Sequence, residues 1–343
     1  MSSSAPTATT SAATVEGNAA ALTEIHHDIL ETHILAKLDP QSLFTTSCVS
    51  SKLHDICRGE NLWKQICKSI WPSINNPRVA DIISSFPSGY RSFFTDSFPT
   101  LHHNFFTDGH RKTTELVSAV DIHYQNKPLF AKVVTSNTDS DAFLDAPFWI
   151  DLLSNETLKL PGKFDTEDET FLSRLGRDLN VSWIVIDPSG RMAANMSSSR
   201  PVLVRQHWVT GDIKVRYVKV LAGGRKGKPN EFVQCKIEVE CVRRVGNGEL
   251  HVGQVSLKIE DMDKSYLSGR DSLVILQDAL ESGERKRGRD GEEKEIYDKY
   301  LGKRKERREK LQKIERRLEM VDRATRISIS MAMLFLLFGS LVS

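Results

Sequence analysis

The chain has 343 residues, of which 39% are apolar and 27% are charged, and its formal net charge is +2. This is the composition of an ordinary globular protein with room for two domains, and it gives no reason to expect a polyanionic partner for the whole molecule. The five cysteines form no C-x-x-C pair and have no histidine at zinc spacing. The sequence therefore predicts reduced, partly buried thiols, with no metal site, disulfide framework or cofactor.

Residues 1–21 are rich in Ser, Thr and Ala. They lack a basic start and an apolar stretch of about 7–15 residues, which excludes a secretory signal. A transit peptide is disfavoured because the segment contains Glu16 and no Arg. We interpret the segment as a disordered leader of a cytoplasmic or nuclear protein.

Residues 22–71 carry apolar residues at helical spacing and predict three short helices. Asp39-Pro40 ends the first helix and begins the second, because aspartate caps a helix well and proline suits its first turn. The third begins at Leu62-Trp63, after Arg58-Gly59. A unit of this size buries little apolar surface by itself, so we expect it to bind a partner.

The order and separation of these residues resemble the F-box. The matching positions are Ile34-Leu35, Leu38-Asp39, Leu43, Val49-Ser50-Ser51-Lys52-Leu53 and Leu62-Trp63, whereas the usual opening Leu-Pro pair falls at His26-His27. The resemblance implies binding to a Skp-type adaptor, which links to a cullin and a RING subunit that hold the transfer chemistry. The candidate adaptor-binding residues are Leu30, Ile34, Leu35 and Leu43. The alternative role for each is a contact within the core of the module itself, the role that we assign to Trp63.

Residues 72–110 are rich in Phe, Pro and Ser and are interpreted as a connector. In residues 111–280 the apolar period changes to two, as in Cys235, Ile237, Val239 and Cys241. Tight turns such as Gly246-Asn247-Gly248 separate such runs. The predicted fold class is α+β, with a three-helix module followed by an antiparallel, sandwich-like domain, a charged helix and an apolar C-terminal helix.

Several short runs in the strand-rich body resemble a plant F-box family whose clients are undefined. They are Ser118-Ala119-Val120-Asp121-Ile122, Ala146-Pro147-Phe148, Ser182-Trp183-Ile184, Ile186-Asp187-Pro188 and Gln206-His207-Trp208. Catalytic motifs are not found, because Gly223 to Lys228 departs from the phosphate-loop spacing and no G-x-S-x-G is present. Trp149, Trp183 and Trp208 either line a ligand pocket or pack in the core.

Residues 284–326 predict a charged helix with an excess of about six positive charges. Leu311, Ile314, Leu318 and Val321 have the three-four spacing of a coiled-coil seam. The basic cluster at 303–308 could serve nuclear import or bind nucleic acid. A nucleic-acid partner is not expected, however, because no aromatic residues alternate with the basic ones.

Residues 327–343 are uncharged and predict a C-terminal membrane anchor formed by Ile327, Met331, Leu334, Phe335, Leu337 and Phe338. A helix of this length reaches about 25 Å, near the lower limit for crossing a bilayer core of about 30 Å. Arginines precede the segment, so the positive-inside rule would keep the F-box in the cytosol. The alternative is a tail that packs on the body or lies at a membrane interface.

The leading hypothesis is a non-enzymatic F-box adaptor of an SCF-type ubiquitin ligase, in which residues 22–71 bind the ligase and residues 111–280 bind an unknown protein client. The second hypothesis is a membrane-attached, lectin-like β-sandwich protein without a ligase role. Binding of the Skp-type adaptor by residues 22–71 distinguishes the two.

Overall fold

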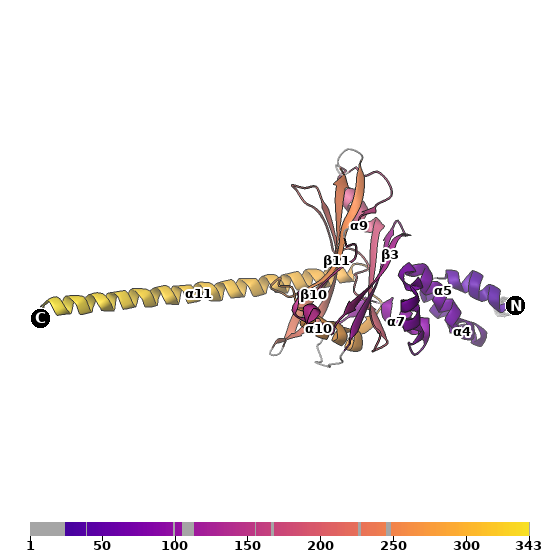
Figure 1. Ribbon diagram of the computed structural model, residues 1–343, viewed down its shortest axis with the longest axis horizontal. Coiled ribbons are helices and arrows are strands. Elements are labelled where there is room, and N and C mark those ends of the chain that lie inside the picture. The colour runs from indigo at the N-terminus through magenta and orange to yellow at the C-terminus, as the bar shows by residue number, and fades with distance from the viewer. Residues whose placement is uncertain are drawn as a thin grey trace, which may run out of the picture.

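A helical module, two antiparallel sheets that share a core, and one long helix make up the molecule (Figure 1). The computed structural model describes residues 25–38, 40–98, 100–104, 113–154, 156–165, 168–225, 228–244 and 248–342. The layers follow one another from the N-terminal helices through the sheets to the C-terminal helix, which projects far from the rest (Figure 1). The α+β prediction is confirmed.

The N-terminal module contains more helices than the sequence predicts. Its segments are α2 (His27–Ile29), η1 (Leu30–Ile34), η2 (Leu35–Lys37), α3 (Pro40–Ser47), α4 (Ser51–Cys57), α5 (Glu60–Ile70), η3 (Pro72–Asn75), α6 (Pro77–Ser84) and α7 (Gly89–Ser97). Ser50 caps α4 by accepting a hydrogen bond from the backbone N–H of Leu53 at 3.2 Å.

The segment interpreted as a connector is helical from Pro72 to Ser97 and belongs to the core of the module. Pro72 and Pro77 each occupy a first helical turn, where a missing N–H costs nothing. The aromatic side chains of the segment pack against the earlier helices, for example Phe93 edge-on to Trp71 at 5.7 Å between ring centroids. The Phe-rich composition therefore marks a core and not a linker.

A four-stranded antiparallel sheet lies next to the module. Its strand order is β3 (Lys127–Asn137), β2 (Glu115–Tyr124), β6 (Leu179–Asp187) and β7 (Met192–Asn195). One face carries Val117, Ala119 and Ile184, which pack on the helices. The other face, with Val120 and Trp183, packs on the second sheet. The central strands are thus buried on both sides.

The second sheet has six strands and forms the other half of the sandwich. Its order is β4 (Trp149–Asp151), β11 (Glu249–Glu260), β10 (Lys228–Arg244), β9 (Ile213–Arg225) and β8 (Leu203–Gln206), and β5 (Leu158–Lys159) also pairs with β11. The predicted alternation is confirmed, because Cys235 and Ile237 are buried and lie opposite Ile259 and Leu257. Arg225 at the end of β9 pairs with Lys228 at the start of β10. Lys226, Gly227, Gly246 and Asn247 lie outside the described residues.

Helices complete the body. They are α8 (Asp141–Asp145), α9 (Phe171–Asp178) and α10 (Gly269–Ser282). The apolar side of α10, including Ile275 and Leu276, contributes to the core shared by the two sheets.

The predicted boundaries of the charged helix are wrong at its start. Residues Glu284–Lys286 form strand β12, which pairs with β1 (Thr100–His102), and a single helix α11 runs from Glu292 to Val342. Gly291, with a φ of +80°, lies directly before the helix and prevents an earlier start. The charged segment and the apolar tail are therefore parts of one helix.

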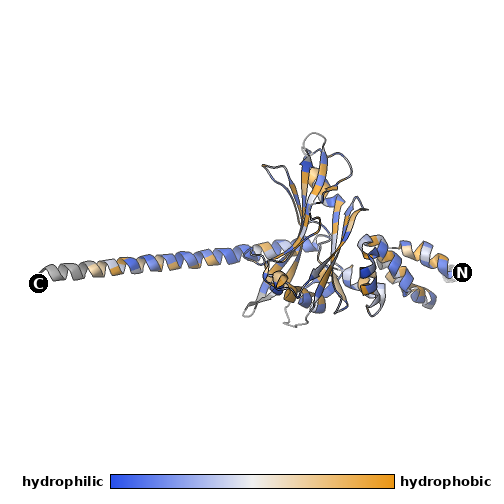
Figure 2. Ribbon diagram, in the orientation of Figure 1, coloured by the Kyte–Doolittle hydropathy of each residue, from blue (hydrophilic) through white to orange (hydrophobic). Residues whose placement is uncertain are grey.

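The first turns of α11 pack on the six-stranded sheet, and the rest projects into solvent (Figure 1). Tyr297 and Tyr300 are buried against Val218 and Met262. Arg307 pairs with the Glu231 carboxylate at 2.9 Å and is the last strong contact. Beyond it, hydrophilic residues predominate with isolated apolar positions (Figure 2).

No helix within the described residues is both long and apolar enough to cross a membrane. Ile327 and Met331 are exposed on α11. The side chains of Leu334, Phe335, Leu337 and Phe338 lie outside the described residues. The membrane anchor stays a prediction.

A buried carboxylate joins the helical module to the four-stranded sheet. The backbone N–H and the hydroxyl of Ser73 in η3 donate to Asp121 in β2 at 2.7 and 2.6 Å. Burial raises the pKa of Asp121 to about 6, although the hydrogen bonds from Ser73 act in the opposite direction. The ionised form is therefore costly at neutral pH.

Replacing Asp121 with Asn is expected to stabilise the protein progressively as the pH rises from about 4 to about 7. The folded-state pKa of about 6 lies above the ordinary value of 3.8, so the stability that this group contributes is present at low pH and is lost as the pH rises through 6. The gap corresponds to about 3 kcal/mol. An asparagine stays neutral throughout. Urea unfolding of both proteins across this range measures the difference.

The control is Asp121→Ala, which leaves the Ser73 N–H buried without an acceptor and should be about 1–3 kcal/mol less stable than Asp121→Asn at every pH. A difference between Asp121→Asn and the wild type that does not change with pH would rule out Asp121 as the titrating group.

Candidate partner-binding surface

Four large apolar side chains of the helical module are exposed to solvent between residues 29 and 49. Ile29 is 49% exposed, Ile34 is 38%, Phe44 is 71% and Val49 is 68%. They belong to α2, η1, α3 and the turn after α3. These exposed apolar groups of one module are the candidates for contact with a partner.

The residues predicted from the sequence are mostly buried. Leu30, Leu35 and Leu43 are each 1% exposed or less and contribute to the core of the module. Only Ile34 among the candidates reaches solvent. The alternative role, a contact within the module itself, therefore describes three of the four positions.

Each buried candidate has an exposed apolar neighbour in the sequence. The pairs are Ile29 and Leu30, Ile34 and Leu35, and Leu43 and Phe44. Adjacent residues on a helix point about 100° apart, so only one of each pair faces the core. The spacing of apolar residues locates the pairs, but the choice within a pair depends on distant residues such as Ile66 and Ile83.

The interior of the helical module, beneath these exposed side chains, is closely packed. The indole N–H of Trp63 donates to the backbone carbonyl of Cys57 at 2.8 Å, and its ring lies 4.9 Å from that of Phe94. The Glu60 carboxylate accepts from the N–H of Tyr90 at 2.9 Å. Gly89 has a φ of +50°, and a Cβ there would meet the same carboxylate, so this position favours glycine.

The cysteines offer little nucleophilic character. Cys57, Cys67, Cys235 and Cys241 are buried, and burial raises the pKa of each thiol because it disfavours the thiolate. Cys48 is exposed. No cluster of three or more His, Cys, Asp or Glu side chains within the described residues could hold a metal ion.

The tryptophans do not form one pocket. Trp183 is fully buried and donates to the Ser118 hydroxyl at 3.1 Å. Trp149 is exposed beneath the ammonium of Lys258, which lies 4.2 Å from its ring centroid. Trp208, 92% exposed, lies in the loop between β8 and β9. Of these three tryptophans, only Trp183 packs in the core.

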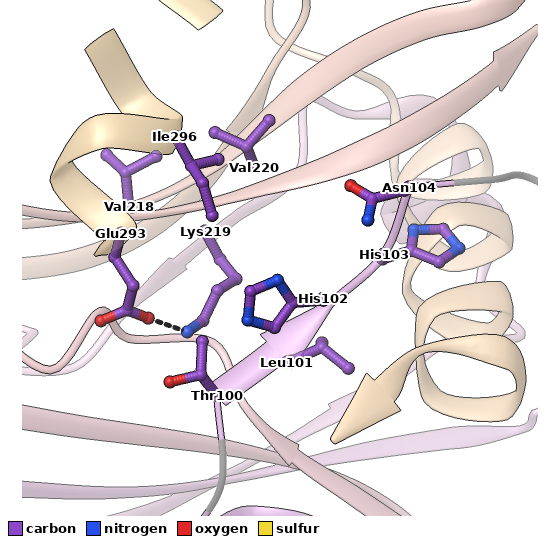
Figure 3. A pocket seen from close by; sticks show the side chains of 10 residues that line it. All are labelled: Thr100, Leu101, His102, His103, Asn104, Val218, Lys219, Val220, Glu293 and Ile296. Atoms are coloured by element: carbon purple, nitrogen blue, oxygen red, sulfur yellow. Dashed lines mark hydrogen bonds and ion pairs between the residues drawn. The ribbon is translucent and has the colours of Figure 1, made fainter. Parts of the chain in front are cut away.

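Polar contacts fix the start of α11 to the body. Lys219 and Glu293 form a buried ion pair beside a cavity of about 20 Å³, room for about one water molecule (Figure 3). His103 lies 2.8 Å from the Asp278 carboxylate. Burial lowers the pKa of His103, and Asp278 partly offsets this effect. We assign these four side chains a role in holding the fold together, because they bind one another inside the protein and do not face an open pocket.

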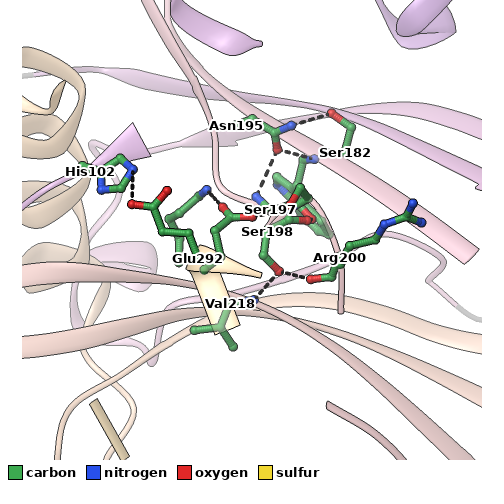
Figure 4. A network of polar contacts seen from close by, with 12 residues as sticks. His102, Ser182, Asn195, Ser197, Ser198, Arg200, Val218 and Glu292 are labelled. Carbon is green, nitrogen blue, oxygen red and sulfur yellow. Dashed lines mark hydrogen bonds and ion pairs between the residues drawn. The ribbon is translucent and has the colours of Figure 1, made fainter. Parts of the chain in front are cut away.

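The same network continues into the sheets (Figure 4). Asn195 accepts from the backbone N–H groups of Trp183 and Ser197 at 3.1 and 3.0 Å. The Ser198 hydroxyl donates to the carbonyl of Arg200 at 2.7 Å and accepts from the N–H of Val218 at 3.2 Å. The β7–β8 connection is thereby held between the two sheets.

The basic cluster at 303–308 is partly engaged with the body. Lys303 lies 4.4 Å from the ring centroid of Phe232 in β10. Arg304 lies 5.9 Å from the ring centroid of Tyr300, a residue of the same helix. Arg307 pairs with both Glu231 and Asp263. Cations held in this way are less available to phosphates. The expectation of no nucleic-acid partner stays a prediction.

A groove of about 410 Å³ lies where the helical module meets the four-stranded sheet. The module contributes Trp71 and Phe98, and the sheet contributes His123 from β2 and Asn180 and Ser182 from β6. Its volume is in the range of small-ligand sites.

Comparison with known proteins gives one family. A family model described as F-box-like matches residues 28–69. The F-box protein At2g27310 of Arabidopsis thaliana is 38% identical over 312 residues, which cover 86% of this chain and 91% of the relative. The probable F-box protein At2g36090 of the same plant is 38% identical over 86% of each chain. The F-box protein At3g44326 is 36% identical over 85% of this chain and 83% of its own. No solved structure shows a significant match.

Replacing Leu35 with Asp is expected to unfold the helical module, because a charge would be buried in its apolar core at a cost of several kcal/mol. The matched variant Phe44→Asp places the same charge on an exposed position and should change the free energy of unfolding by about 0.5 kcal/mol or less. Thermal unfolding followed by circular dichroism compares them. Equal losses of stability would contradict the assignment of Leu35 to the core and Phe44 to the surface.

Proposed function

The chain belongs to the plant F-box proteins, and from this membership we propose that it is a substrate-recognition adaptor of an SCF-type cullin-RING ubiquitin ligase. The helical module binds a Skp-type adaptor, and the β-rich body recruits a protein client for ubiquitination. The chain itself is not an enzyme in this proposal, because the transfer chemistry belongs to the other subunits.

The observation that carries the adaptor role is the group of exposed apolar side chains Ile29, Ile34, Phe44 and Val49 in the F-box region. Removing such groups from water on association is the main source of binding free energy at protein interfaces, and a few well-packed residues supply most of it. Leu30, Leu35 and Leu43 act indirectly, by holding these side chains in place from the core.

The body supports the client role through its position. It packs on the side of the module formed by η3, α6 and α7, whereas the exposed apolar residues belong to α2, η1 and α3. Engagement of an adaptor by the first helices therefore leaves the sheets and their loops accessible to a client.

The second candidate is a membrane-attached, lectin-like protein without a ligase role. The uncharged groove beside Phe98 favours a ligand-binding function of the body. Such a function does not require an adaptor. The two candidates differ in whether purified Skp-type adaptor binds the folded full chain.

Replacing Phe44 or Val49 with Ala is expected to weaken binding of a purified Skp-type adaptor about fivefold or more, because truncating a well-packed interface residue costs more than about 1 kcal/mol. Isothermal titration calorimetry with the full chain measures the affinity. The control Trp208→Ala removes an aromatic side chain that is even more exposed than Phe44, from the loop between β8 and β9, and should leave the affinity unchanged. An unaltered affinity in both module variants, with intact folds, would refute the assigned surface.

The tail anchor is tested separately from the adaptor role. Residues 300–343 fused behind a fluorescent reporter should remain in the membrane pellet after carbonate extraction, with the reporter on the cytosolic side. Leu334→Lys combined with Leu337→Lys should release the fusion, since each central charge costs about 2.5–3.5 kcal/mol in a spanning helix. Release of the unmodified fusion would disprove the anchor.

A further inference from the structure

The outer face of the four-stranded sheet changes character where the helical module stops covering it. Beneath the helices this face carries Val117, Ala119 and Ile184. Further along the same strands it carries His123, Asn180 and Ser182, which line the junction groove of about 410 Å³. The uncovered part of the face is thus polar and walled on one side by the module.

The described residues that line this groove include no Asp, Glu, Lys or Arg. The outer face of the six-stranded sheet differs from the groove in charge. On that face β9 and β10 carry ion pairs such as Lys214 with Glu240 and Arg216 with Glu238. Burial also lowers the pKa of His123, which favours its neutral form. The groove therefore suits an uncharged ligand.

Three polar side chains in the groove have unused hydrogen-bonding capacity. Within the described residues, no hydrogen bond or ion pair engages the side chains of His123, Asn126 or Asn180. A carboxamide and a neutral imidazole each offer both a donor and an acceptor. By contrast, Asn195 is already occupied by Ser182, Ser197 and the backbone of Trp183.

An aromatic platform stands beside these groups. Phe98, at the end of α7, is 50% exposed and stacks on Phe94 with ring centroids 4.7 Å apart and an angle of 18° between the rings. The stacking fixes the orientation of the exposed ring. A flat apolar surface next to neutral donor-acceptor groups can pack the C–H face of a ring while the groups bind its hydroxyls.

We propose that this junction groove binds a neutral saccharide, with Phe98 packing on the sugar ring and His123, Asn126 and Asn180 bonding its hydroxyl groups. Each hydroxyl donates and accepts, as these side chains do. The saccharide is either free or attached to a client as a glycan. The proposal names a ligand for the body and so deepens the client role, but its test uses no Skp-type adaptor, so either proposal can fail alone.

Saturation-transfer difference NMR on the full chain tests the free form with D-glucose, D-galactose, D-mannose and N-acetyl-D-glucosamine as probes. At least one probe should give a saturation signal that Asn180→Ala and Phe98→Ala each weaken about tenfold, the effect of one lost hydrogen bond or stacking contact. Asn180→Asp keeps the shape, removes the donor and should weaken binding similarly. Asn61→Ala, an exposed asparagine outside the groove, should have no effect.

The attached form is tested with a glycoprotein that carries N-linked glycans, before and after enzymatic deglycosylation. Binding that is lost on deglycosylation and in Asn180→Ala supports the proposal and identifies the source as a glycan. Binding that survives deglycosylation but is lost in Asn180→Ala would identify a peptide segment as the ligand and overturn the saccharide assignment. Absence of binding in both arms would overturn it as well.

Discussion

The fold depends on strand β2, which is buried on both of its faces. Val117 and Ala119 pack on the helical module, and Val120 and Ile122 pack on the six-stranded sheet. A shift of its pairing register by one residue would exchange the side chains on its two faces and so move polar side chains into the apolar cores. Asp121 is the one carboxylate that β2 buries, and the two hydrogen bonds from Ser73 fix the helical module at this point of the sheet. Because of this double burial, the helical module and the β-rich body form one packed unit.

The sequence predicts those parts of the fold in which one face is apolar and the other polar, although the polar residues Gln234, Lys236 and Glu238 of β10 are themselves buried. Cys235 to Cys241 alternate with polar residues because β10 has a core side and an outer side, and the pattern reports this directly. The F-box helices are recognised for the same reason. Residues 72–98 give no such signal, since Pro and Phe indicate a linker by composition while their partners are Trp63, Trp71 and the sheet. Contacts between residues distant in the chain decide that segment.

The candidate site shows the same division between local and distant information. Spacing identifies the apolar pairs Ile34-Leu35 and Leu43-Phe44, but the buried member of each is selected by helices that follow later in the chain. The short π-helical turn at Leu30–Ile34 adds to the difficulty, because it shifts the residues that follow away from regular α-helical spacing. The junction groove is composed from five separate segments and has no motif of its own, so sequence reasoning missed it.

Helix α11 shows how a periodic pattern can have two causes. Glu293, Tyr297, Tyr300, Arg304 and Arg307 follow one another at spacings of three and four. The body covers or pairs with Glu293, Tyr297, Tyr300 and Arg307, and Arg304 lies against Tyr300 of the same helix. The predicted coiled-coil seam from Leu311 to Val321 continues this stripe at the same spacing, where the helix has left the body and the seam is exposed. Along the first half of α11, the body packs on the side of the helix where the second helix of a coiled coil would pack. The three-four spacing therefore originates, for its first half, in packing on the sheet, and a helical partner is not needed to explain it.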